Sequence, residues 1–282
     1  MKKLPIGIHT FSQIINDGYL YIDKTKEAYE LINNYKYVFL SRPRRFGKSL
    51  FLTTLQAVFE GKKEFFKGLY IYDKYDFEPY LVIRIVFAGV MSTKESLNDV
   101  IKRNMRNNEE NLQCEINERL SSTERFAALI KNAATKYNRP AVILIDEYDK
   151  PILDNIIDPA MRDYARDTLK GVYEHIKYND EYVKFAFLTG VSKFSKVSIF
   201  SGLNNLVDIS LSPEYGNIYG YTPTDLETVF QPYMASVDME KMKRCLLLPK
   251  IVPIRGGIDM SIMVENNVYI IEFKMETGDG IA

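Results

Sequence analysis

The chain has 282 residues, 46% of them hydrophobic and 26% charged, which is typical of a globular protein with a sizeable core. Lysine plus arginine and aspartate plus glutamate both number 37, so the net charge is zero, which argues against a protein that coats nucleic acid through general basicity. Cys114 and Cys245 lie far apart, which argues against a disulfide framework or a zinc site and fits a cytoplasmic location. No apolar run approaches the roughly 20 residues of a membrane span, so we expect no membrane association.

Short β-prone runs alternate with helical patterns along most of the chain. Strands are predicted at residues 37–40, 81–87, 141–145, 185–188 and 206–209, where apolar residues cluster between polar ones. Helices are predicted up to residue 32 and at residues 50–60, 97–105, 126–136 and 161–176, where apolar residues recur with a helical period. This alternation indicates an α/β fold with a mostly parallel sheet between two layers of helices.

A phosphate-binding loop is indicated between the first predicted strand and the helix at 50–60. Gly47 permits close approach of the backbone to a phosphate, Lys48 supplies a cation, and Ser49 supplies a hydroxyl for Mg²⁺. The common pattern, G-x-x-x-x-G-K-[ST], has a further glycine where this chain has Arg42, which must then make the turn with a side chain attached. A solvated basic turn is the alternative interpretation of this segment.

Two adjacent acids follow the predicted strand at 141–145. In nucleoside triphosphatases, the strand beside the phosphate loop ends in an Asp that holds Mg²⁺ through water, and a following Glu polarises the attacking water. Asp146 fits the metal role and Glu147 the role of the base. The loop and the acids, in this order, favour nucleotide binding over a strand that merely runs into an acidic loop. Thr189, which ends the fourth predicted strand, is expected to sense the γ-phosphate from the next position in the sheet.

The C-terminal tail contains a hairpin signal, with β-prone runs at residues 258–264 and 268–273 around an Asn-rich turn. Asp259 belongs to the first run, and Glu272 and Lys274 share one face of the opposing strand. Two carboxylates that bind a metal and a lysine that orients water are the arrangement of Mg²⁺-dependent nucleases. An amphipathic hairpin with a solvated charged face is the simpler interpretation, and the pattern alone favours it.

Five blocks of the sequence resemble the AAA-ATPase-like proteins of bacteria and archaea, which carry a C-terminal nuclease-like domain of the PD-(D/E)XK superfamily. The blocks are LPIGIHTF, YLYIDKT, SRPRRFGKSLFL, ILIDEYDKPI and LTGVSKFSKVSIFSGLNNL, and they follow the order of that family over about residues 3–230. An RPRRFGKS loop is usual in the family, so the resemblance implies that Arg42 does not impair the loop. The tail GGIDMSIMVENNVYIIEFKM resembles the nuclease core segment, with Asp259, Glu272 and Lys274 at its acidic and basic positions.

The resemblance implies a P-loop NTPase three-layer sandwich over residues 1–230, a shortened linker over 231–250 and a partial nuclease-like segment over 251–282. This last segment is expected to be a β-hairpin remnant of the PD-(D/E)XK fold, because about thirty residues cannot build an independent nuclease core. Family members have a long helical region before the nuclease domain, which is nearly absent here. We therefore expect either an internal deletion with truncation or a hairpin that packs on the ATPase, and no nuclease activity from it.

The expected function is the binding of ATP with Mg²⁺, followed by hydrolysis. Ser49 and Asp146 are the expected metal ligands, and Glu147 is the expected catalytic residue. The expected nucleotide-binding residues are Arg44, Arg45, Phe46, Gly47, Lys48, Ser49 and Asp146.

Two alternative functions stay open. The first is a Mg²⁺-dependent nuclease, regulated by ATP, that cuts DNA through the catalytic residues Asp259, Glu272 and Lys274. The second is a non-catalytic remnant that holds nucleotide without turnover. Arg44 and Arg45 are expected to contact phosphate, to meet a neighbouring subunit in a homo-oligomer, or to be solvated.

Overall fold

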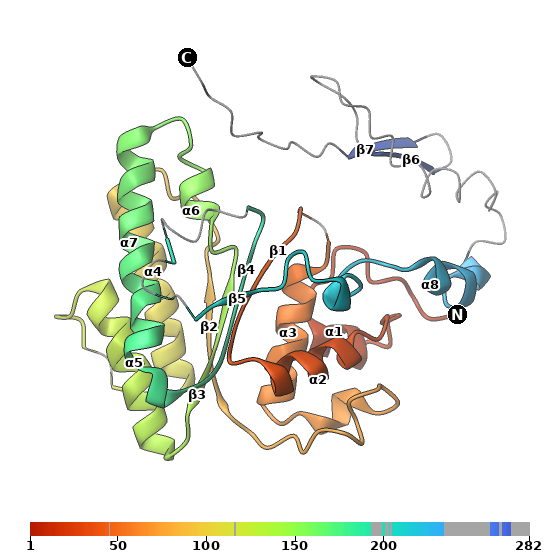
Figure 1. The fold of residues 1–282 in the computed structure, drawn as a ribbon, viewed down its shortest axis with the longest axis horizontal. Helices are drawn as coiled ribbons and strands as arrows, with labels where there is room; N and C mark the ends of the chain where they lie inside the picture. The colour runs from red at the N-terminus through yellow and green to blue at the C-terminus, as the bar shows by residue number, and fades with distance from the viewer. Residues whose placement is uncertain are drawn as a thin grey trace. The chain divides into compact units, whose positions relative to one another are not determined.

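The computed structural model describes residues 1–44, 46–115, 117–192, 199–200, 203, 205–233, 260–264 and 267–271. The chain divides into two compact units, a larger one of residues Lys2–Tyr221 and a smaller one of Thr222–Ala282 with Met1. Figure 1 shows the course of the helices and strands along the chain. None of the helices in the described ranges is long and apolar enough to cross a membrane.

The larger unit is built on a parallel sheet of five strands in the order β2-β3-β4-β1-β5. The strands are β1 (Tyr37–Ser41), β2 (Leu81–Val86), β3 (Ala141–Asp146), β4 (Val183–Gly190) and β5 (Val207–Asp208). Each overlaps a strand that the sequence predicts, so the predicted α/β fold with a parallel sheet is confirmed.

One expectation about the sheet is wrong: the strand that ends in Asp146 does not lie beside the strand before the phosphate loop. β4 lies between β1 and β3, since Leu40 pairs with Thr189 and Ile145 pairs with Leu188. The carboxyl ends of all three strands nevertheless meet at one edge of the sheet, because the strands are parallel. The acids after β3 and the loop after β1 therefore share that edge, with Thr189 between them.

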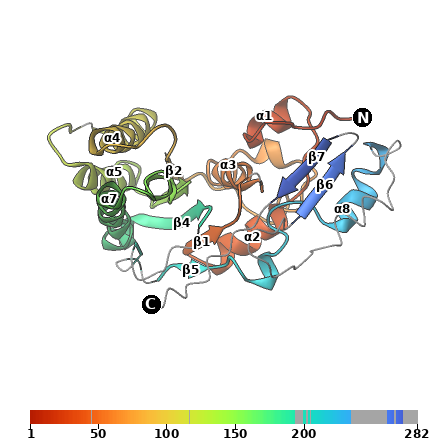
Figure 2. The same ribbon diagram turned by 90° about the horizontal axis from the view of Figure 1, so that it is seen from above.

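Helices cover both faces of the sheet, as Figure 2 shows. α4 (Lys94–Asn111), α5 (Ser122–Tyr137) and α7 (Pro159–Tyr178) cover one face, and α2 (Thr25–Asn34) and α3 (Lys48–Phe59) cover the other. Alternate strand residues face the two layers, so Phe39 packs with the first group of helices and Val38 and Leu40 pack with the second. α1 (Phe11–Asn16), which the sequence did not predict, packs on the outer side of α3.

Several shorter helices complete the fold. α6 (Lys150–Leu153) follows β3 directly, and α8 (Pro223–Thr228) lies in the smaller unit. Single 3₁₀ turns occur at Lys63–Phe66, Asp180–Tyr182, Pro213–Tyr215 and Gln231–Tyr233.

α4 and α5 begin earlier than their apolar periods predict because a capping box starts each of them. The Thr93 hydroxyl accepts the N–H of Ser96 at 3.2 Å, and the Ser96 hydroxyl accepts the N–H of Thr93 at 3.0 Å. Ser121 and Glu124 make the same reciprocal pair at the start of α5. These polar residues lie outside the apolar stripe, so hydrophobic periodicity alone does not include them.

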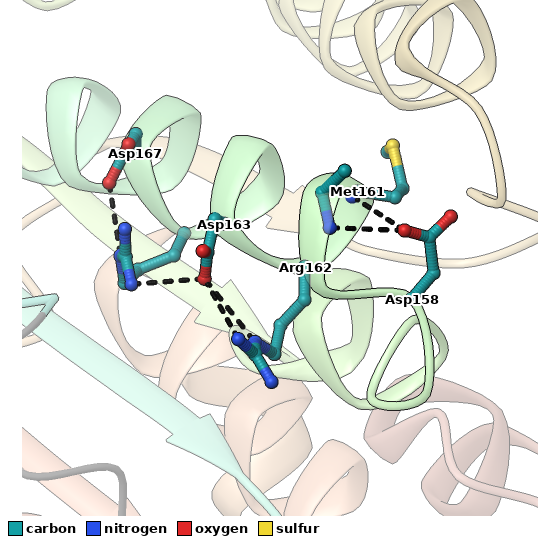
Figure 3. A network of polar contacts seen from close by, with 7 residues as sticks. Asp158, Met161, Arg162, Asp163 and Asp167 are labelled. Atoms are coloured by element: carbon teal, nitrogen blue, oxygen red, sulfur yellow. Dashed lines mark hydrogen bonds and ion pairs between the residues drawn. The ribbon is translucent and has the colours of Figure 1, made fainter.

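α7 also has a polar start. The Asp158 carboxylate accepts the N–H groups of Ala160 and Met161, both at 3.1 Å, and so satisfies two donors of the first turn. A chain of exposed ion pairs follows along the same helix, as Figure 3 shows: Arg162 with Asp163, Arg166 with Asp163, and Arg166 with Asp167. Because solvent screens such pairs, they contribute little to stability. The two aspartates nevertheless balance the positive charges of the two arginines on this surface.

Side chains of α4 cover β2 at the edge of the sheet. Asn108 accepts the backbone N–H of Arg84 and donates to its carbonyl, both at 2.8 Å. Asn104, one turn earlier, accepts the N–H of Val86 at 2.9 Å and donates to its carbonyl at 3.1 Å. The two asparagines therefore satisfy backbone groups that a neighbouring strand would otherwise bind.

The smaller unit contains α8 and a two-stranded hairpin of β6 (Met260–Val264) and β7 (Asn267–Ile271). The hairpin is antiparallel, with Met260 opposite Ile271. The predicted nuclease residues lie outside the described residues, and their role stays a prediction: Asp259, Glu272 and Lys274.

Candidate nucleotide site

The loop between β1 and α3 begins with Arg42, which stands where the common pattern has a glycine. Its backbone N–H donates to the carbonyl of Gly190 at 3.1 Å and continues the pairing of β1 with β4. Its guanidinium donates to the carbonyl of Ser41 at 3.1 Å and to that of Ser210, beyond β5. The φ angle of Arg42 is not positive, so the turn does not require a glycine here. The arginine side chain instead connects the start of the loop to Ser210, the second residue after β5.

Gly47 ends the loop and begins α3. Its φ of +90° is left-handed, a conformation that favours glycine. A Cβ at this position would meet nothing within 4 Å, so the space in front of the backbone is open. Gly47 is the cap residue of α3 and has no side chain to accept the N–H groups of the first turn, which lie at the positive end of the helix dipole. This geometry is suited to an anion such as a phosphate.

The other predicted loop residues divide between core and solvent. Phe46 is partly buried and packs against the apolar residues between α3 and the sheet, which anchors the loop. Arg44 is exposed, and its positive charge acts against the protonated form of both Lys48 and Glu147. Ser49 is the half-buried second residue of α3. Arg45 lies outside the described residues.

Lys48, the first residue of α3, is only 7% exposed. Its ammonium donates to the carbonyls of Arg42 at 2.9 Å and Pro43 at 2.8 Å. Burial lowers the pKa of this ammonium, and the acids that follow β3, Asp146 foremost, oppose that shift. Lys48 is therefore a desolvated cation that interacts with loop carbonyls and with the acids after β3.

Asp146 and Glu147 stand at the carboxyl end of β3. Asp146 is 2% exposed, and its Oδ1 accepts the backbone N–H of Glu147 at 3.0 Å. Glu147 has a φ of +54°, a left-handed conformation that costs energy in a residue with a side chain. Burial, and then the charge of Asp146, raises the pKa of the Glu147 carboxyl. A carboxylate with a raised pKa is suited to act as a general base near neutral pH.

β4 places Thr189 between the loop and the acids. Its hydroxyl donates to the carbonyl of Leu40 at 3.0 Å. The buried hydroxyl of Tyr219 approaches Thr189 and interacts with the charge of Asp146, yet no described residue makes a well-directed hydrogen bond with it. A buried hydroxyl normally has a partner, and Thr189 is the described side chain that interacts with this one. The sequence patterns gave no signal for Tyr219.

Asp149 is a second residue that sequence reasoning missed. Its carboxylate is fully buried and accepts the N–H groups of Val191 at 3.0 Å and Ser192 at 2.5 Å. Burial raises the pKa of this carboxyl, and the hydrogen bonds from the two N–H groups oppose the shift. The one available signal was the second aspartate of the run Asp-Glu-Tyr-Asp, which has no role in the general phosphate-site pattern.

We call Tyr148, Asp149 and residues 190–192 the clamp. Besides the bonds of Asp149, the Tyr148 hydroxyl donates to the carbonyl of Ser192 at 3.0 Å. A Cβ on Gly190 would lie 2.5 Å from Oδ1 of Asp149 and closer still to Cδ1 of Tyr148, so no side chain fits there. The clamp therefore fixes the segment after the acids to the end of β4, and so holds the strained backbone next to it.

The residues at this edge suit a nucleoside triphosphate with Mg²⁺. The open start of α3 and the ammonium of Lys48 match phosphate oxygens, while the hydroxyl of Ser49 and the carboxylate of Asp146 are hard oxygen ligands. Across the part of the chain that the structure describes, no three His, Cys, Asp or Glu side chains are grouped to hold a metal ion. Mg²⁺ here would need phosphate and water as further ligands, which is its usual coordination in proteins.

Comparison with known proteins supports the same interpretation. The chain is similar to an uncharacterised protein encoded in the vnfD 5′ region of Azotobacter chroococcum mcd 1, with 46% identity over 245 residues. This match covers 86% of the chain but 47% of the relative, so the chain spans about half the length of that protein. The profile of the family described as predicted AAA-ATPase matches residues 5–200, which include every described residue of the candidate site except Tyr219. The chain therefore belongs to the predicted AAA-ATPase-like family.

Proposed function

We propose that this protein binds ATP with Mg²⁺ at the loop between β1 and α3 and hydrolyses it. The observation that carries the proposal is the meeting of buried Lys48, at the open start of α3, with Asp146 and Glu147 at the end of β3. Membership in a predicted AAA-ATPase family supports the choice of nucleotide. The roles of individual residues rest on their chemistry and surroundings.

Each side chain has a distinct role in this proposal. Lys48 exchanges its two carbonyl partners for oxygens of the β- and γ-phosphates. Ser49 and Asp146 hold Mg²⁺, which when bound offsets negative charge on the phosphates. Glu147 accepts a proton from, or orients, the attacking water, and its raised pKa suits that task. Thr189 stands at the end of β4, next to β1, and its role in this proposal is to sense the terminal phosphate.

Replacing Glu147 with glutamine is expected to separate binding from hydrolysis. The substitution keeps the size of the side chain but removes the base, so the rate of phosphate release should fall by at least about 100-fold. The affinity for Mg-ATP should stay within about threefold, because Glu147 does not hold the phosphates. Steady-state phosphate release and calorimetric titration with Mg-ATP measure the two effects. Glu64→Gln, at an exposed position on a 3₁₀ turn, is the matched control and should leave both unchanged.

Two results would count against this assignment. Equal phosphate release by wild type and Glu147→Gln would remove Glu147 from the role of base. Tight ATP binding by wild type with no measurable phosphate release would instead favour the alternative, a protein that binds the nucleotide without turnover.

A Mg²⁺-dependent nuclease is the alternative function, and one observation favours it. The hairpin pairs Met260 with Ile271, and Asp259 and Glu272 are the next residues in sequence beyond this pair. The test is to incubate the protein with DNA and either Mg²⁺ or Mn²⁺. Cleavage that Glu272→Ala abolishes would establish the activity. Absent cleavage, or equal cleavage by the variant, would exclude it.

A further inference from the structure

A cavity of about 590 Å³ lies along the β2 edge of the sheet, between α3 and α4. The described residues that line it include none from the loop between β1 and α3 and none from the acids after β3. Its charged side chains are Arg84, Arg103 and Glu60, and Tyr80 adds an aromatic wall. Side-chain amides supply most of the remaining polar surface: Gln56, Asn104, Asn107, Asn108 and Asn111.

Arg84 enters this cavity from β2, and no acid among the described residues forms an ion pair with it. Its Nε is buried and has no hydrogen-bond partner in the described part of the chain. The one hydrogen bond that the structure gives its side chain there is long, 3.4 Å from Nη1 to Oε1 of Gln56. Burial lowers the pKa of this guanidinium, but an arginine stays charged in proteins. Because Arg84 is half-buried and its Nε is buried, the guanidinium is partly removed from water, which favours a counter-ion.

Two acids, Asp146 and then Glu60, oppose the lowering of the Arg84 pKa by their charge, but neither forms an ion pair with it among the described residues, and Glu60 already has two partners. Its Oε1 accepts from Gln56 at 2.7 Å, and its Oε2 pairs with the ammonium of Lys62 at 2.5 Å. The second arginine of the cavity, Arg103, is exposed and makes a single long contact, 3.4 Å to the carbonyl of Ala88. Neither arginine forms an ion pair with an acid among the described residues. The cavity therefore presents two guanidinium groups with unused donors.

We propose that this cavity binds a small polar molecule through an oxyanion group, a carboxylate or a phosphate, held by Arg84 and Arg103. The planar fork of a guanidinium matches two oxygens of either group. Asn107 and Asn111 are exposed on the α4 wall, where their amides offer donors and acceptors to the rest of the ligand. The volume is that of an ordinary small-molecule site.

Titration calorimetry with inorganic phosphate and with malonate tests this site and separates the two kinds of oxyanion. The expected result is binding of at least one probe to wild type, with a dissociation constant that rises at least about tenfold in Arg84→Met and in Arg103→Gln. Arg106→Gln is the matched control and should bind the probe as wild type does. Arg106 lies on α4, as Arg103 does, but it pairs with Glu118 and does not line the cavity. Lys48→Ala changes a loop that does not line the cavity, so this variant should keep the part of the binding that depends on Arg84 and Arg103.

Two outcomes would overturn the proposal. The first is no heat of binding from either probe at millimolar concentration. The second is binding that Lys48→Ala abolishes and Arg84→Met keeps, which would place the anion at the loop before α3. Arg84→Met should fold, because it removes a buried unpaired charge and keeps an apolar stem. Arg103 is exposed, so Arg103→Gln decides the question even without that variant.

Discussion

Replacing Lys48 with alanine is expected to abolish measurable ATP binding. Lys48 is 7% exposed and is the first residue of α3, so its bonds to phosphate would form in a poorly hydrated place. Its two present bonds, to the carbonyls of Arg42 and Pro43, show that two donors are held within this loop. Two charge-assisted bonds at about 1.5–3 kcal/mol each correspond to a loss of affinity of at least about 100-fold.

Calorimetric titration with Mg-ATP measures this loss, and the thermal midpoint of the free variant shows whether it is folded. Lys170→Ala is the matched control, because this lysine lies on α7, has a 40% exposed side chain, and faces Glu174 at 4.0 Å. It should keep the affinity of wild type. An affinity of Lys48→Ala within about threefold of wild type would remove the β1–α3 loop from nucleotide binding.

Replacing Gly190 with alanine is expected to loosen the clamp and to slow hydrolysis with little effect on binding. The new Cβ would lie 2.5 Å from Oδ1 of Asp149 and closer still to Cδ1 of Tyr148, and both neighbours are fully buried. They cannot move aside without breaking the bonds of Asp149 to the strand end, so the free energy of unfolding should fall by about 1–3 kcal/mol or more. Because the clamp holds the backbone beside Glu147, kcat should fall at least about tenfold at an unchanged KM.

Denaturant unfolding and steady-state phosphate release test this expectation. Asp149→Asn is the second variant, since it keeps the shape of the side chain but removes the charge and puts an NH2 group, which cannot accept an N–H, in place of one of the two oxygens that Val191 contacts. Gly171→Ala is the matched control and should keep the stability and kcat of wild type. Its new Cβ would lie 3.2 Å from a methyl group of Thr123, and alanine has a higher helix propensity than glycine. Wild-type stability and kcat in Gly190→Ala would contradict a positioning role for the clamp.

The sequence was sufficient for the strands and for the main helices, because their signals are local. An apolar run such as that of β3 and a helical period such as that of α3 depend only on neighbouring residues. Strand order is a different kind of property, since it depends on which strands pair over long distances. The insertion of β4 between β1 and β3 left no mark on the patterns of those strands, and the expectation about Asp146 was wrong for that reason.

The candidate site divides in the same way. Lys48 and the two adjacent acids follow recognisable motifs, so their residue types and spacing were enough to indicate them. Asp149 binds backbone N–H groups of residues 191 and 192, which give no side-chain signal in a sequence. Arg42 departs from the common phosphate-loop pattern, and the contact that accounts for it cannot be read from the neighbouring residues. Its guanidinium donates to the carbonyl of Ser210, far along the chain.

The asparagines that cover β2 have a consequence for how this domain associates with other chains. An uncovered edge strand is a template for a strand from another molecule, and so a route to aggregation. Asn104 and Asn108 bind backbone groups of β2 at one edge of the sheet. β5, at the other edge, is only two residues long. Among the described residues, neither edge of the larger unit therefore offers a long row of open backbone groups. We expect an assembly of this domain to form through helices and loops, because the sheet has little open edge to extend.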